Sequence, residues 1–325
     1  MIKNRMRVVL LINLGTPSEA TPYAVRKYLA EFLSDPRVVE LPAWLWKPIL
    51  YTIVLPTRSK RLAKLYQSIW LDEGSPLAVY SKKLAERVQT QLGDFYKVVL
   101  AMRYGRPSIK DVLTDLLARN AIDSLIVLPL YPQYSAATTA SCFDVVSNIV
   151  KKQRFIPFLT FNSSYFDQDF YIKALAEKIR GYWEREGTKD YLLFSFHGLP
   201  KYCSKLGDPY EQQCYKTVNL LASELDLSPD QYQLVFQSRF GKAEWLQPYC
   251  DVVLQELPSQ GIKRVAVICP GFAVDCLETL EEISKRYREL FLKLGGESFN
   301  YIPALNASSE HSSLLVSLIH KLFEH

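Results

Sequence analysis

The 325-residue chain lacks the glycine loops with which the common nucleotide-binding folds hold phosphate. Its 13 glycines form no Gly-x-Gly-x-x-Gly sequence and no loop that ends in Gly-Lys-Ser or Gly-Lys-Thr. The six cysteines form no Cys-x-x-Cys pair, so no structural zinc site is indicated and reduced cytosolic thiols are the default. These absences argue against a dehydrogenase, an ATPase and a disulfide-stabilised secreted protein.

The sequence also has no long apolar run and no strong excess of charge. The most apolar stretch, residues 44–55, contains Lys47 and Pro48 and is far shorter than the roughly 20 residues that cross a bilayer. The apolar run at residues 8–12 has no small-residue cleavage site after it, so we interpret it as a first strand rather than a signal peptide. The net charge of +5 is modest and spread along the chain, which favours a small anion over nucleic acid as the partner. We expect a cytoplasmic protein.

Histidine is scarce, which makes one position conspicuous. His197 follows the apolar residues 192–196 and precedes Gly198-Leu199-Pro200, a pattern typical of a buried parallel strand that ends abruptly. The carboxyl ends of such strands form the ligand-binding edge of open α/β sheets. We therefore predict a functional role for His197; the alternative is a structural histidine with satisfied hydrogen bonds. The other three histidines fall in the last fifteen residues: His311, His320 and His325.

Strand-like and helix-like segments alternate along the whole chain. The eight predicted strands are residues 7–14, 96–104, 124–131, 155–161, 191–197, 233–238, 264–269 and 298–302. Amphipathic stretches long enough for crossover helices lie between them, for example at residues 108–120, 169–186 and 277–294. The pattern predicts an α/β protein with two Rossmann-like lobes, each a parallel sheet of about four strands flanked by helices.

The predicted boundary between the lobes lies near residues 162–169, a polar and aromatic segment without a long linker. It divides the chain into an N-terminal lobe, residues 1–168, and a C-terminal lobe, residues 169–325. Lobes joined so closely are expected to pack against each other, with the active-site cleft between them. The two halves also show weak internal symmetry, because at residues 127–132 and again at 267–272 an apolar run leads through a turn into a helix.

A second candidate for chemistry follows the seventh strand, at residues 269–282. Here Glu278 and Glu282 project from the start of a predicted helix, and two carboxylates that face each other and a cleft suit a cation or a proton. The alternative is a capping box, in which Asp275 caps the helix and Glu278 only satisfies a backbone N–H. The helix would bury a stripe formed by Leu280, Ile283, Tyr287, Leu290 and Leu294.

These two segments belong to a longer set of motifs. Residues 192–210 contain Ser195-x-His197-Gly198-Leu199-Pro200, and residues 270–282 contain Asp275-Cys276-Leu277-Glu278-Thr279-Leu280. Both closely resemble ferrochelatases, and five further blocks follow the order of that family, so the resemblance covers nearly the whole chain. Those blocks are Asn13-Leu14-Gly15-Thr16-Pro17, Gly74-Ser75-Pro76, Met102-Arg103-Tyr104-Gly105, Tyr131-Pro132-Gln133-Tyr134-Ser135 and Gln237-Ser238-Arg239-Phe240-Gly241.

The resemblance implies a lyase with a chelatase-like fold that inserts Fe²⁺ into protoporphyrin IX and releases two protons, the last step of haem biosynthesis. It assigns catalysis and metal contact to His197 and Glu278. A neutral imidazole can bind a metal or accept a proton near pH 7, and a carboxylate offers a hard oxygen ligand or a proton exit. Which of the two takes the proton stays open, because a coupled pair shares its titration.

The macrocycle requires a large apolar slot with cations near its propionates. The resemblance places Arg58, Tyr66, Arg103, Tyr134, Ser238, Trp245 and Phe272 around the porphyrin; the alternative for each is ordinary packing. Leu14 stands where some members carry Tyr or Met beside the metal, which leaves an iron ligand from that side in doubt and favours protoporphyrin IX over coproporphyrin III.

The resemblance also bears on which cofactors to expect and which other functions stay open. Some family members bind an iron-sulfur cluster through cysteines near the C-terminus, but no cysteine follows Cys276 here, so we expect no cofactor, with iron as a substrate only. Two other functions stay open: a sister chelatase that acts on coproporphyrin III or sirohydrochlorin, and a porphyrin or haem carrier without turnover. The sequence does not decide the oligomeric state, for which a monomer is the default.

Residues 44–66 are the one stretch suited to meeting a membrane. Apolar side chains come first and cations follow, an order suited to a segment that lies on an anionic interface without crossing it. We expect weak, reversible membrane contact there; the alternative is that the aromatics only pack the lip of the first lobe. The apolar residues are Trp44, Trp46, Ile49, Leu50, Ile53, Val54 and Leu55, and the cations are Arg58, Lys60, Arg61 and Lys64.

Overall fold

The computed structural model describes residues 6–119, 122–187, 190–241 and 243–323. Within these ranges the chain forms two compact units, the first from residues 6–131, 135–164 and 307–323, the second from Pro132–Tyr134 and Tyr165–Asn306. The main crossing, after Ser164, lies inside the predicted boundary segment at residues 162–169. The division differs from the predicted one at the end of the chain, where the last segment returns to the first unit.

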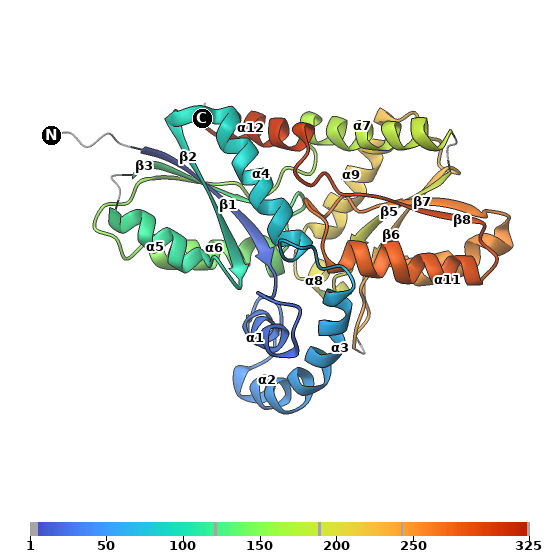
Figure 1. Cartoon of the computed structure of the whole chain (residues 1–325), viewed down its shortest axis with the longest axis horizontal. Helices are drawn as coiled ribbons and strands as arrows, with labels where there is room; N and C mark the ends of the chain where they lie inside the picture. Colours follow the sequence, from blue (N-terminus) through green and yellow to red (C-terminus); the bar gives the residue numbers. More distant parts are fainter. Residues whose placement is uncertain (1–5, 120–121, 188–189, 242, 324–325) are drawn as a thin grey trace. The chain divides into compact units, whose positions relative to one another are not determined.

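The first unit is built on a parallel sheet with the strand order β2-β1-β3-β4; Figure 1 labels β1, β2 and β3. Its strands are β1 (Met6–Gly15), β2 (Tyr96–Tyr104), β3 (Ile122–Pro129) and β4 (Phe158–Phe161). The run from Val8 to Ile12 is fully buried on both faces of β1, as expected for a central strand of a parallel sheet covered on both sides.

Helices cover both faces of this sheet. One face packs on α5 (Ile109–Arg119) and α6 (Ser141–Val150), and the other on α4 (Pro76–Leu92), against which α12 (Ser309–Phe323) lies (Figure 1). The remaining helical segments are α1 (Pro22–Phe32), α2 (Ala43–Ile49), η1 (Leu50–Val54), α3 (Leu55–Gln67), η2 (Gly93–Phe95) and η3 (Ala136–Ala140).

The second unit repeats this topology. Its sheet has the order β6-β5-β7-β8, again with the first strand between the second and the third. The strands are β5 (Tyr191–His197), β6 (Tyr232–Gln237), β7 (Arg264–Ile268) and β8 (Ser298–Ile302). The internal symmetry extends to the helices that follow the third strand of each sheet, because η3 and η5 (Glu278–Tyr287) are both π-helical.

The core that supports the site lies on one face of the second sheet. There α10 (Cys250–Glu256), η5 and α11 (Arg288–Lys293) pack their buried residues against alternate residues of the strands, for example Leu193, Val235 and Val267. The other helical segments of this unit are α7 (Asp169–Glu186), α8 (Lys201–Lys205), α9 (Tyr210–Glu224) and η4 (Leu257–Gln260).

The predicted strands agree closely with the observed ones. The bounds of β2, β5 and β8 are those expected from the apolar runs, and the prediction of two parallel four-strand sheets is confirmed. The clearest shift is at β4, which begins at Phe158 rather than at residue 155. Pro157 explains this shift, since proline has no N–H to donate to a sheet.

The predicted α-helix at residues 277–294 is instead π-helical over ten residues, from Glu278 to Tyr287. Hydrogen bonds from i to i+5 widen the turn, so side-chain contacts move by one residue. Arg286 accordingly bonds Glu281, five residues earlier, at 3.0 Å and stays 3.9 Å from Glu282, four residues earlier. Leu294, predicted in the buried stripe, is exposed.

The segment at residues 44–66 folds as α2, η1 and α3, and its apolar residues divide between surface and core. Trp44 and Ile53 are 79% and 60% exposed, whereas Leu50 and Leu55 are fully buried. The prediction that Leu50 and Leu55 belong to an exposed platform is therefore wrong: they hold the segment to its own unit. Among the described residues, no helix combines the length and the hydropathy needed to cross a bilayer.

Candidate active site

His197 is the last residue of β5, as predicted, and its ring is half-buried. Nδ1 lies 2.7 Å from the carbonyl oxygen of Gly198. Because a carbonyl oxygen can only accept, Nδ1 carries the proton and the Nε2 atom of a neutral ring keeps its lone pair. His197 is thus prepared either to accept a proton or to bind a metal through Nε2.

The backbone that follows His197 is tightly constrained. A Cβ atom at Gly198 would lie 2.8 Å from the carbonyl oxygen of Gln237 and 3.1 Å from the ring of Trp245, so this close approach admits only glycine. The hydroxyl of Tyr210 donates to the carbonyl oxygen of His197 at 3.0 Å. These contacts fix the backbone from which the imidazole projects.

Glu278 begins η5 and is half-buried. Its main-chain oxygen accepts a hydrogen bond of 2.9 Å from Nε2 of Gln237, the residue that pairs with His197 in the parallel register of β5 and β6. The start of η5 therefore lies at the same sheet corner as His197. Within the described part of the chain, the Glu278 carboxylate forms no ion pair, which leaves it available for a cation.

The alternative of a capping box is not what the structure contains. The Asp275 carboxylate, which is buried, accepts instead from the hydroxyls of Tyr301 and Thr279 and from the side-chain amide of Asn306. Glu278 lies beside the thiol of Cys276, whose pKa is raised by burial and by this carboxylate. Glu278 is thus not engaged as the partner of an Asp275 cap.

Glu282 does not face Glu278 across an open site. It is 7% exposed, and its carboxylate accepts hydrogen bonds from the backbone N–H of Ser238 at 3.2 Å, from the hydroxyl of Ser238 and from the hydroxyl of Tyr287 at 3.0 Å. The prediction of two cleft-facing carboxylates is wrong in this respect, because the π-helical turn carries Glu282 into the core of its unit. Burial and the nearby Glu282 carboxylate raise the pKa of Tyr287.

Four of the predicted porphyrin contacts belong to the second unit. Ser238 directly follows β6, and Trp245 packs beside Gly198 with its indole N–H donating to the carbonyl oxygen of Phe240 at 2.9 Å. Phe272 follows β7 and is half-buried against the core. Tyr134 is half-buried, with its backbone N–H bonded to the Gln213 side chain at 2.7 Å.

Three other predicted contacts, Arg58, Tyr66 and Arg103, belong to the first unit. Arg58 is exposed on α3, and Tyr66 is buried on the same helix, where its ring makes a T-shaped contact with Trp70. Leu14 is half-buried near the end of β1. The sequence prediction that all seven contacts line one porphyrin slot stays a prediction.

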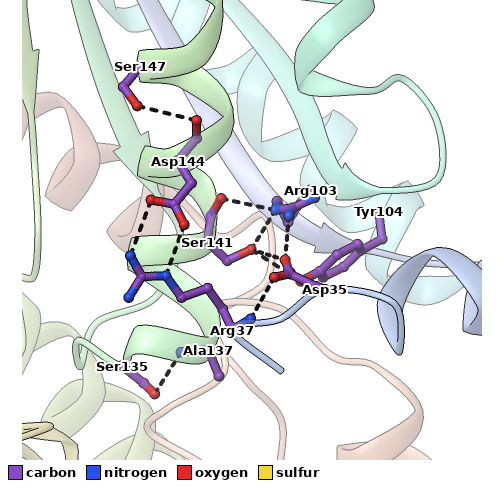
Figure 2. A network of polar contacts seen from close by, with 9 residues as sticks. All are labelled: Asp35, Arg37, Arg103, Tyr104, Ser135, Ala137, Ser141, Asp144 and Ser147. Atoms are coloured by element: carbon purple, nitrogen blue, oxygen red, sulfur yellow. Dashed lines mark hydrogen bonds and ion pairs between the residues drawn. The ribbon is translucent and has the colours of Figure 1, made fainter. Parts of the chain in front are cut away.

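Arg103 takes part in a buried polar network within its own unit (Figure 2). Its guanidinium bonds the Asp35 carboxylate and both the carbonyl oxygen and the hydroxyl of Ser141. The hydroxyls of Tyr104 and Ser141 donate to the same Asp35 oxygen at 2.7 and 2.6 Å, and the backbone N–H of Arg37 donates to the other oxygen at 2.8 Å. These contacts fix the orientation of the Arg103 guanidinium.

The same contacts set the charge of Asp35. Burial by itself raises its pKa, but the hydrogen bonds from Ser141, Arg37 and Tyr104 and the charge of Arg103 outweigh burial and lower it. Sequence reasoning missed Asp35, because a single acidic residue in a loop carries no periodic signal. It missed Gln237 as well, although a polar residue that ends a strand of apolar neighbours is a usable indication.

No group of three or more histidine, cysteine, aspartate or glutamate side chains, among the residues described, is arranged to hold a metal ion. The donors that this corner offers are the Nε2 atom of His197 and the carboxylate of Glu278. Such a set suits a substrate ion that is transferred onward better than an ion held permanently by a full set of protein ligands.

Solved structures with the same fold are chelatases. The chain matches SirB from Bacillus subtilis with Fe³⁺ at a TM-score of 0.59 and 10% identity, over 98% of this chain and 95% of that one. It matches CbiX, described as the terminal enzyme for biosynthesis of sirohaem in denitrifying bacteria, at a TM-score of 0.51 and 13% identity, over 97% and 99% of the two chains. At such low identity these matches define the fold alone, which confirms the predicted chelatase-type architecture.

Sequence comparison identifies the family. A family model described as Ferrochelatase matches residues 7–322. The ferrochelatase of Methylococcus capsulatus is 54% identical over 311 residues, or 96% of this chain and 95% of that protein. Ferrochelatase 1 of Shewanella oneidensis is 51% identical over 315 residues, or 96% and 94% of the two chains. The chain belongs to the ferrochelatase family, which confirms the resemblance inferred from its motifs and the expectation of an enzyme.

Proposed function

We propose that this chain inserts Fe²⁺ into protoporphyrin IX to give protohaem with release of two protons. The observation that carries the proposal is the hydrogen bond between Nδ1 of His197 and Gly198, which leaves Nε2 as a base or ligand at the corner where η5 presents Glu278. Family membership supports the reaction class.

The chemistry follows from what metal insertion requires. Two pyrrole N–H protons must leave the macrocycle, and the ion must shed water as the ring nitrogens bind it. A fixed imidazole lone pair can accept a proton from a pyrrole, and a carboxylate can bind the ion or pass the proton to solvent. We assign both roles to the pair of His197 and Glu278 without dividing them.

Apolar and polar residues near this pair suit a tetrapyrrole. We propose that Tyr134, Trp245 and Phe272 contact the faces of the macrocycle, since a large apolar ligand gains most of its affinity from such burial. Ser238 and, from the first unit, Arg58 and Arg103 would bind propionates, with Tyr66 beside them. The orientation of Arg103 by Asp35 supports this role, because a guanidinium with fixed geometry loses little entropy on binding a carboxylate.

We propose further that iron is a substrate only and that no iron-sulfur cluster is bound. The last cysteine, Cys276, is buried, and burial and Glu278 raise the pKa of its thiol, which disfavours the thiolate that a cluster needs. Protein purified without oxygen is expected to contain no acid-labile sulfide, and a stoichiometric amount would contradict the proposal.

The rival functions are separated by one assay. Purified protein is mixed anaerobically with protoporphyrin IX and Fe²⁺, and porphyrin fluorescence and haem absorption are followed through many turnovers. A chelatase consumes a large excess of porphyrin, whereas a carrier binds about one equivalent and stops. The same assay with coproporphyrin III, sirohydrochlorin and Co²⁺ identifies a sister chelatase by its preferred pair of substrates.

We also propose that the enzyme is a cytoplasmic monomer that touches membranes weakly through α2, η1 and α3. The exposed Trp44, Tyr51 and Ile53 support contact with the interface, and the exposed cations of α3 suit anionic head groups. Such contact would give the enzyme access to a poorly soluble, lipid-seeking porphyrin. Size-exclusion chromatography with light scattering measures the molar mass in solution and so tests whether the protein is a monomer.

A further inference from the structure

We infer that Gln237 is a positioning residue for the proposed reaction: it ties the start of η5 to β6, so that Glu278 stays at the corner of the sheet that presents His197. The inference rests on the proposed function, because it assigns Gln237 a role through Glu278 rather than contact with substrate. Its basis is the set of contacts made by one buried side chain. Gln237 is 2% exposed.

The orientation of the Gln237 amide follows from its partners. The hydroxyl of Ser195 lies 2.8 Å from Oε1, and the thiol of Cys269 lies 3.6 Å from the same atom. Both groups can donate, whereas the carbonyl oxygen of Glu278, 2.9 Å from Nε2, can only accept. The amide therefore presents oxygen to the sheet and nitrogen to η5, and a flipped amide would place two acceptors against each other.

The sheet register makes this arrangement direct. Residues that are paired in parallel strands, and residues two apart along one strand, share a face of the sheet. Gln237 pairs with His197, and Ser195 lies two residues before His197 on β5, so all three share the face that η5 covers. One hydrogen bond from Gln237 thus links the strand next to His197 with the first residue of η5.

A second contact from the neighbouring residue keeps the same turn in place. Ser238 has a φ of +66° and bonds the carboxylate of Glu282 through both its backbone N–H and its hydroxyl. Gln237 and Ser238 consequently hold η5 at two points, Glu278 and Glu282. Because a buried amide whose partners are lost costs free energy, η5 cannot move away from β6 without penalty.

The test uses two substitutions at Gln237, to methionine and to glutamate, and one control substitution to methionine elsewhere on β6. Gln237→Met keeps the length of the side chain and removes both the donor and the acceptor; Gln237→Glu keeps an acceptor for Ser195 but, as a carboxylate, replaces the donor to Glu278 with a second acceptor and adds a negative charge. Gln233→Met is the matched control, since Gln233 lies on the same strand and the same face but is only half-buried. Each variant is assayed for metal insertion, melting temperature and hydrogen–deuterium exchange.

Both Gln237 variants are expected to lower kcat at least tenfold, to change the KM for porphyrin less than threefold, and to shift the pH profile of kcat, while Gln233→Met behaves as wild type. Amide exchange over residues 279–284 should rise in both Gln237 variants. Unchanged exchange, or raised exchange with wild-type kcat and pH profile, overturns the inference. The exchange readout needs no activity, so a wild-type protein that fails to insert iron refutes the proposed function separately.

Discussion

Ser238 donates both its backbone N–H and its hydroxyl to the carboxylate of Glu282. This carboxylate belongs to the same π-helical segment as Glu278, yet the two have different environments. Glu282 is buried among three donor groups from Ser238 and Tyr287, whereas Glu278 is half-buried and keeps its carboxylate available. The structure thus separates a carboxylate that maintains the fold from one suited to chemistry.

The first prediction uses this difference. Glu278→Gln is expected to lower the rate of metal insertion at least a hundredfold and to leave the melting temperature nearly unchanged. Glu282→Gln is expected to destabilise the protein by about 1–3 kcal/mol, because a charged acceptor of several buried hydrogen bonds is lost. Anaerobic iron-insertion rates and thermal unfolding of both variants measure the contrast. A large loss of stability in Glu278→Gln with a normal rate would instead return Glu278 to a structural role.

The second prediction concerns His197. Replacing it with alanine is expected to abolish metal insertion and to preserve both the fold and porphyrin binding, because the ring projects from the end of β5 and is only half-buried. Tyr210→Phe provides a control: it removes a hydrogen bond to the His197 backbone and keeps the imidazole. Residual turnover in His197→Ala above about a tenth of wild type would contradict the role assigned to the imidazole.

The sequence predicted some parts of the fold correctly and others not. The apolar run before His197 predicted β5 with its correct ends, because a short run closed by Gly198 and Pro200 has few other solutions in an α/β chain. Periodicity failed at η5, since apolar spacing there is compatible with an α-helix and the π-helical turn depends on tertiary contacts such as those of Gln237 and Ser238.

Tertiary contacts also explain the other misses. Asp35 and Arg103 are 68 positions apart in the chain, and nothing local indicates that they pair. Leu50 and Leu55 lie in an apolar run whose exposed and buried members differ only through the fold, so composition alone assigned them all to one platform. Contacts between distant residues were thus beyond a reading based on local pattern.

The third prediction is a dependence of stability on pH that originates at Asp35. Its pKa is lowered in the folded protein, so its contribution to stability is fully present above the pKa of the unfolded chain and is lost as the pH falls through the folded pKa. Asp35→Asn should therefore cost most at pH 7, about 3 kcal/mol, because it leaves Arg103 as a largely buried charge without its partner. The cost should shrink towards pH 3.

Denaturant unfolding of wild type and Asp35→Asn at pH 7, 5 and 3 measures this dependence. Asp144→Asn is the matched control. Asp144 pairs with Arg37 in the same unit, but this pair lies at the surface, with side chains that are 41% (Asp144) and 43% (Arg37) exposed. Exposed pairs contribute about 0–1 kcal/mol, so this control should change little at any pH. A cost for Asp35→Asn that stays constant from pH 7 to pH 3 would contradict the assignment.

The last prediction concerns membrane contact. Trp44, Tyr51 and Ile53 are exposed on α2 and η1, while Leu50 and Leu55 beneath them are fully buried, so the exposed residues are not needed for the core. The exposed cations Lys60, Arg61 and Lys64 follow on α3. Each cation near an anionic surface contributes about 1 kcal/mol, and salt screens that attraction. Binding should therefore be weak, reversible and sensitive to ionic strength.

Sedimentation with liposomes tests each part of this prediction. Wild type is expected to pellet with anionic vesicles at low salt, and much less with neutral vesicles or at high salt. Replacing Lys60, Arg61 and Lys64 with alanine should abolish the difference between the two kinds of vesicle, and Trp44→Ser with Ile53→Ser should reduce pelleting even on anionic ones. A triple alanine variant of Lys82, Lys83 and Arg87 on α4 is the control for loss of charge alone. Equal pelleting of every variant on every vesicle would mean that α2, η1 and α3 make no membrane contact, and that the exposed aromatics only complete the surface of their own unit.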